Sequence, residues 1–87
     1  MKVWAIRTNK PCKSCRQNHG FMTVKHKILV AKEDSKHILQ GFYNKLIEKH
    51  SGYFELDQID LDFIKKKKIG FIDAVDCLIL ERKFYGN

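Results

Sequence analysis

Apolar and polar positions alternate along two stretches of the chain, which is the pattern of strands with one buried face. The first covers residues 2–7, and the second, FMTVKHKILVA, covers residues 21–31. In the second stretch His26 falls on the apolar face, whereas Lys25 and Lys27 fall on the opposite face. The pattern therefore predicts two strands, the second of them half-buried with its lysines in solvent.

A helical pattern follows between residues 35 and 50. Its apolar side chains recur at spacings of one, three and four, as along the buried stripe of a helix. The stripe consists of Ile38, Leu39, Phe42, Tyr43, Leu46 and Ile47. Gly52 can adopt the left-handed conformation that ends many helices. Gly41, inside the helix, costs about 1 kcal/mol relative to alanine, so we expect it to allow a neighbouring element to pack closely.

The C-terminal half mixes strand and helix signals. Residues 53–64 place acids between apolar residues, which predicts a strand followed by a short turn or helix. Residues 70–80 fit either a helix or a buried strand. Residues 1–87 are thus expected to form a single α+β domain, a small β-barrel or curved, mostly antiparallel sheet with one main helix. The loop at 8–20 holds the single proline together with Asn, Ser and Gly.

The positive charge lies at one end of the sequence. The net charge is +7, yet residues 33–87 carry nine Lys or Arg against ten acids. Residues 1–32 contain eight basic residues and no acid. An uninterrupted basic segment predicts a polyanionic partner, and nucleic acid is the first candidate. The proposed contacts are Arg7, Lys10, Lys13, Arg16, Lys25 and Lys27, with Trp4 as a ring on which a base could stack.

The segment CKSCRQNHG, residues 12–20, contains candidate metal ligands. Cys12 and Cys15 have the spacing that lets two thiolates bind one tetrahedral ion, and His19 follows four residues later. His26 or Cys77 could supply a fourth ligand. A thioredoxin-like redox pair is a second interpretation, and two reduced thiols in a basic loop are a third. Three cysteines and no signal-peptide-like apolar stretch indicate a cytoplasmic protein with reduced thiols.

Three segments resemble the ASCH domain of the PUA-like β-barrel superfamily. They are VWAIRTNK (3–10), with Arg7 at the family's arginine, KHKILVAKED (25–34) and KKKKIGFIDAVDCLIL (65–80). The resemblance implies a small barrel that contacts RNA or a nucleotide, and it implies a closing strand at residues 70–80. The chain lacks the family's Gly-x-Lys segment, and Ala5 stands where the family has a glutamate. Both features belong to the family's pocket, so the resemblance favours binding over catalysis.

Three hypotheses follow. The first is a small basic module that binds nucleic acid, RNA more than DNA, through phosphates. The second is an enzyme of the same superfamily that acts on a modified nucleoside, with Arg7 and Asp76 in its pocket. The third is a small protein, of the kind that phages encode, that binds an acidic host protein through the same basic face. The sequence contains no P-loop, nucleophile elbow or HExxH pattern, so catalysis has no positive support.

Overall fold

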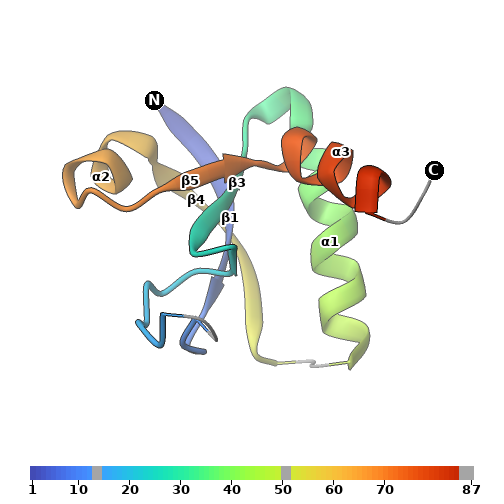
Figure 1. The fold of residues 1–87 in the computed structure, drawn as a ribbon, viewed down its shortest axis with the longest axis horizontal. Helices are drawn as coiled ribbons and strands as arrows, with labels where there is room; N and C mark the ends of the chain where they lie inside the picture. Colours follow the sequence, from blue (N-terminus) through green and yellow to red (C-terminus); the bar gives the residue numbers. More distant parts are fainter. Residues whose placement is uncertain (13–14, 50–51, 85–87) are drawn as a thin grey trace.

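The computed structural model describes residues 1–12, 15–49 and 52–84. These residues form an α+β fold in which a curled, mostly antiparallel sheet makes a half-barrel (Figure 1). The strands are β1 (Lys2–Thr8), β2 (Thr23–Val24), β3 (Lys27–Ala31), β4 (Phe54–Asp60) and β5 (Phe71–Asp73). The helices are the 3-10 turn η1 (Glu33–Ser35), α1 (Lys36–Lys49), α2 (Leu61–Lys66) and α3 (Ala74–Phe84). The predicted fold class is confirmed.

Strand β1 lies in the middle of the sheet. It pairs antiparallel with β4 along its whole length, and its first half pairs antiparallel with β3. Strand β3 pairs with β2 on the same side as β1, and with β5, in parallel, on its other side. Beyond Ile6, the segment around Phe21 and Met22 replaces β3 as the neighbour of β1. The far end of β1 is therefore next to the loop that follows it.

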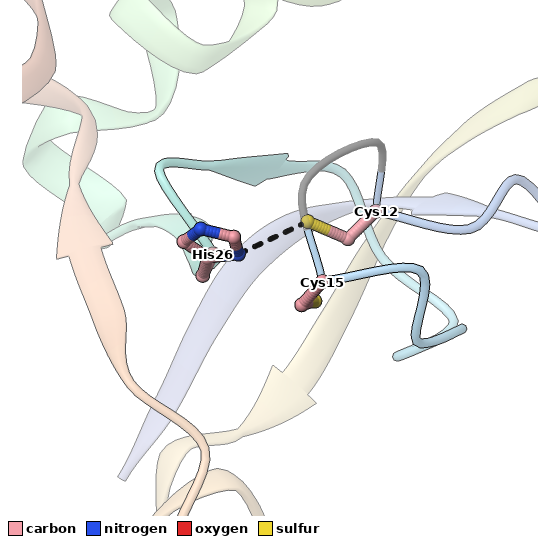
Figure 2. A group of neighbouring side chains, drawn as sticks. All are labelled: Cys12, Cys15 and His26. Atoms are coloured by element: carbon pink, nitrogen blue, oxygen red, sulfur yellow. Dashed lines mark hydrogen bonds between the residues drawn. The ribbon is translucent and has the colours of Figure 1, made fainter.

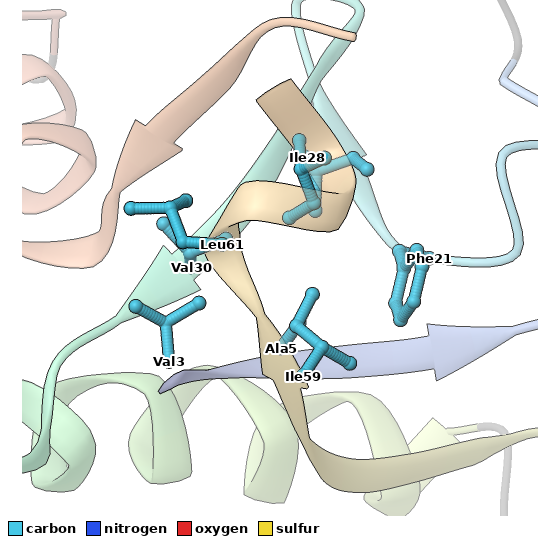
Figure 3. Close-up of a cluster of buried hydrophobic side chains, with 8 residues drawn as sticks. Val3, Ala5, Phe21, Ile28, Val30, Ile59 and Leu61 are labelled. Carbon is cyan, nitrogen blue, oxygen red and sulfur yellow. The ribbon is translucent and has the colours of Figure 1, made fainter. Parts of the chain in front are cut away.

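The side chains of β1 are buried on both faces of the sheet. Val3 and Ala5 join one apolar cluster, which α2 covers with Leu61 and Ile64 (Figure 3). Trp4 and Ile6 join a second cluster on the opposite face. That cluster contains residues of α1 and α3, which lie together on one side of the sheet (Figure 1). Two buried faces explain why β1 has apolar residues in succession from Val3 to Ile6.

The helix boundaries agree with the sequence in two places. Helix α1 covers almost all of the predicted range, and Gly52 has φ +88°, as expected for a left-handed stop. Strand β4 is followed by the short helix α2, whose first turn is capped by Asp60. Its carboxylate accepts a hydrogen bond from the Asp62 N–H at 3.0 Å. None of the helices in the described ranges is long and apolar enough to cross a membrane.

Two predicted strands are wrong in part. Residues 21–31 form a hairpin, because the backbone turns at Lys25 and His26, both with positive φ. The closing strand that the resemblance implied for residues 70–80 ends at Asp73. There the Asp73 carboxylate accepts a hydrogen bond from the Val75 N–H at 2.9 Å, and helix α3 begins. Ala74 and Cys77 are buried three residues apart while the residues between them are exposed, which is helical periodicity.

Gly41 does not serve a close approach. A Cβ atom built at this position meets nothing within 4 Å. The residue is exposed on α1, so the close packing that we expected there is absent. Gly41 therefore leaves α1 less stable than alanine would.

Replacing Gly41 with alanine should raise the free energy of unfolding by about 1 kcal/mol, because alanine loses less backbone entropy in a helix. Urea denaturation measures the change. Gly52→Ala is the matched control and should destabilise, since Gly52 has φ +88°. A Gly41→Ala protein that is no more stable than the wild type would contradict the assignment of an open helix surface.

Candidate functional site

The loop that follows β1 makes a tight turn between Cys12 and Gln17. The Arg16 N–H donates to the Cys12 carbonyl at 2.7 Å, and the Cys12 N–H donates to the Gln17 carbonyl at 2.9 Å. Arg16 has φ 58°, the left-handed conformation that costs a side-chain-bearing residue about 1–2 kcal/mol. The turn folds Cys15 back toward Cys12.

The Asn18 side chain holds this loop against the end of β1. The Asn18 amide donates to the Asn9 carbonyl at 3.1 Å, and its oxygen accepts from the Gly20 N–H at 2.9 Å. The Gly20 carbonyl in turn accepts from the Thr8 N–H at 3.0 Å. The loop therefore returns to the strand from which it started.

The hairpin turn between β2 and β3 brings His26 to the same place. Two-residue hairpin turns with positive φ at both central positions favour Asn-Gly or similar pairs. Here the central residues are Lys25, with φ 52°, and His26, with φ 71°. Lys25 and His26 are less favourable in this turn than an Asn-Gly pair. They place one ammonium and one imidazole beside the loop.

The two turns bring Cys12, Cys15 and His26 together (Figure 2). One ligand atom from each lies within 4.8 Å of the others, and the Cys12 Sγ is 3.5 Å from the His26 Nδ1. His19 is next to this group, with its Nε2 3.7 Å from the Cys15 Sγ. Cys12, Cys15 and His26 are close enough to hold a metal ion, and we call these three residues the metal-capable group.

Cys77 does not join this group. It is buried in the cluster beneath α1 and α3, with Leu39 and Ala74. Cys12 is also buried, at 8% exposure, whereas Cys15 and His19 are half-buried and His26 is exposed. Of the two alternatives for a fourth ligand beside Cys12, Cys15 and His19, the fold brings His26 to the cysteines and leaves Cys77 in the core.

A basic pocket of about 210 Å³ lies beside the cysteines. Lys10 and Lys25 line it, and so do Cys12 and His26, which also belong to the metal-capable group. The Lys10 ammonium lies 5.3 Å from the centre of the Phe54 ring, which forms another wall. None of the described residues lining this pocket is acidic. Two of the proposed nucleic-acid contacts thus converge on one site.

Arg7 lies elsewhere and is already paired. Its Nε and Nη2 atoms are each 2.9 Å from the Asp57 carboxylate, and its guanidinium stacks over Phe21 with 5.0 Å to the ring centre. The register of β1 against β4 sets Arg7 opposite Glu55 and Ala5 opposite Asp57. Asp57 is therefore the diagonal neighbour of Arg7 on the adjacent strand, within reach of its long side chain. The positive charge of Arg7 is therefore offset by an acid distant in sequence.

Trp4 also lies apart from the pocket. Its indole Nε1 donates to the Glu33 carboxylate at 2.7 Å, and the Lys36 ammonium lies 3.8 Å from the centre of its ring. These contacts tie Trp4 to the start of α1. It therefore does not share a site with Lys10 and Lys25.

Of the remaining proposed contacts, Arg16 and Lys27 are exposed, and Lys13 lies outside the described residues. Lys27 begins β3, where its Cγ would lie 3.2 Å from a Cβ added at Gly70. Sequence reasoning missed Phe54 as a pocket residue, because an apolar residue in an acidic strand carries no signal of a site. No family model, curated protein or solved structure matches this chain.

Replacing Arg16 with glycine should stabilise the protein by up to about 1 kcal/mol, because glycine adopts the left-handed conformation without strain. The free energy of unfolding, measured in urea, tests this. Gln17→Gly is the control and should destabilise, since Gln17 is not among the described residues with positive φ. If both variants lose stability equally, the turn after Cys15 is not the one described.

Proposed function

We propose that this protein is a small cytoplasmic nucleic-acid-binding module that prefers single-stranded RNA. The observation that carries the proposal is the basic pocket beside the cysteine loop, which Lys10, Lys25, His26 and Phe54 line and in whose described lining no residue is acidic. Lysines bind phosphates as point charges, and the buried Phe54 ring gives the cavity an apolar wall beside them. The resemblance to the ASCH domain is part of this proposal and agrees with it.

The contacts that we propose form two groups. Lys10 and Lys25 bind phosphates in the pocket, and the exposed Arg16 and Lys27 extend the basic surface around it. Arg7 contributes less, because its charge is paired with Asp57. Trp4 makes no stacking contact in this scheme, because its indole N–H donates to Glu33 and the Lys36 ammonium lies over its ring.

An enzyme acting on a modified nucleoside is less well supported. Its two proposed pocket residues were Arg7 and Asp76. Arg7 is on the face of the sheet that carries Ala5, where Phe21 packs. Asp76 is exposed on α3, a helix that packs against the opposite face. The two side chains therefore do not face one pocket, and we propose a binding role.

We further propose that the metal-capable group binds zinc together with His19. A tetrahedral zinc ion, with bonds of about 2.3 Å to sulfur and about 2.0 Å to nitrogen, holds those ligands roughly 3.5 Å apart. The two sulfur–nitrogen separations of 3.5 Å and 3.7 Å are close to that value. Cys12, Cys15, His19 and His26 would then form a closed structural site. Two thiolates would balance the two charges of the ion.

The phosphate contacts can be tested by a salt titration of binding to a fluorescein-labelled oligouridine. Each phosphate contact on a single strand contributes about −0.7 to the slope of log K against log salt. Lys10→Ala and Lys25→Ala should each flatten the slope by about that amount. The control is Lys45→Ala, which removes the same charge from the exposed surface of α1 and should leave the slope nearly unchanged.

Two results would contradict the nucleic-acid proposal. One is an equal loss of affinity in all three variants, because binding would then follow net charge alone. The other is tighter binding of polyglutamate than of an oligouridine of equal charge, which would favour an acidic protein as the partner.

Zinc content provides a separate test. Purified protein should contain about one zinc per chain, and Cys15→Ser should lose it because the site would keep only three ligands. Metal analysis by mass spectrometry measures both. Cys77→Ala is the matched control and should keep its zinc, since Cys77 lies in the apolar cluster with α1 and α3, away from the proposed ligands. A wild-type protein without zinc after growth in zinc-replete medium would leave two thiols in a basic loop.

A further inference from the structure

Cys12 and His26 take part in two features at once. Both belong to the metal-capable group, and both line the basic pocket with Lys10 and Lys25. Cys12 is two residues after Lys10, and His26 directly follows Lys25. A bond through a metal from Cys12 to His26 would therefore fix the distance between the two backbone segments that carry the lysines.

The backbone around the group is unfavourable by itself. Among the described residues, positive φ without glycine occurs at Arg16, Lys25 and His26, and at one further residue, Lys68, in the turn that follows α2. Side-chain-bearing residues keep such conformations when their surroundings impose them, and such residues cluster at functional sites. The Cys12 Sγ lies 3.5 Å from the His26 Nδ1, and this contact joins the hairpin turn to the cysteine loop.

We propose that zinc occupancy switches the basic pocket between a binding and a non-binding arrangement. With zinc at Cys12, Cys15, His19 and His26, the hairpin turn is held against the loop, and Lys10 and Lys25 contact phosphates of the same strand. Without zinc the turn relaxes, and the two lysines no longer act together. This inference rests on the proposed function and names its regulation.

Two of the four ligands allow a clean test, because Cys15 and His19 do not line the pocket. Their replacement removes the metal without removing a wall of the site. The control is His37→Ala, which removes an exposed histidine from α1 and leaves the ligands intact. Binding of a fluorescein-labelled oligouridine is measured for each protein in excess zinc and after dialysis against a chelator.

We expect the zinc-loaded wild type to bind the oligouridine about tenfold or more tightly than the chelated protein, within the usual range of coupling between two sites. Cys15→Ser and His19→Ala should bind weakly in both conditions. His37→Ala should respond to zinc like the wild type. Because coupling is reciprocal, the oligouridine should also raise the affinity for zinc by the same factor, as measured by competition with a chromogenic chelator.

The outcomes separate this inference from the function on which it rests. Equal oligouridine affinity with and without bound zinc would overturn the switch and leave the nucleic-acid module in place. Absence of oligouridine binding in both states would overturn the module, and the switch with it. A global loss of the far-ultraviolet circular dichroism signal on chelation would also overturn the switch, because zinc would then hold the whole fold.

Discussion

Strand β1 is the element on which the rest of the structure depends. It is paired on both edges and buried on both faces, so its register fixes the positions of everything around it. Its last residue, Thr8, is buried, and its N–H donates a hydrogen bond to the Gly20 carbonyl of the returning loop. The cysteine loop is therefore anchored at its start and at its end to the most constrained strand of the sheet. A loop held in this way can position ligands without a large core of its own.

The same strand also decides which positive charge of the N-terminal third is paired with an acid of β4. Its partner β4 carries Glu55, Asp57 and Asp60, and the antiparallel register sets Asp57 within reach of Arg7. Asp60 lies 3.6 Å from the N-terminal ammonium. Lys10 follows the end of β1, where the pairing with β4 stops at Phe54. Phe54 supplies an aromatic wall of the pocket. The uneven charge of the sequence thus becomes, in three dimensions, a basic site at one end of the sheet.

Local signals in the sequence predicted the elements that depend on local physics. The stripe from Ile38 to Ile47 predicted α1, and the acid–apolar alternation predicted β4 and the short helix after it. The hairpin turn was missed because Lys25 and His26 are not turn-forming residues, and only the fold makes them adopt positive φ. The residues of VDCLIL fit either a helix or a strand, and the family resemblance implied a strand. The hydrogen bond from the Val75 N–H to the Asp73 carboxylate begins helix α3 there instead.

The sequence predicts the chemical type of the candidate ligands, but it does not predict which distant residues lie beside them. The spacing of Cys12, Cys15 and His19 marks candidate ligands in the sequence, whereas the choice between His26 and Cys77 depends on which face each strand and helix presents. The pairing of Arg7 with Asp57 spans fifty residues and follows from strand register alone. Phe54 became a pocket wall for the same reason.

The central claim is that nucleic acid binds at the end of the sheet where Lys10 and Lys25 meet. The most direct measurement is a titration of isotope-labelled, zinc-loaded protein with an oligouridine, followed by amide chemical shifts in nuclear magnetic resonance spectra. The account predicts that the largest shifts fall on residues 8–12, on residues 21–26 and on Phe54. Shifts confined to β4 beyond Phe54, to α1 or to α2, with those segments unchanged, would contradict it.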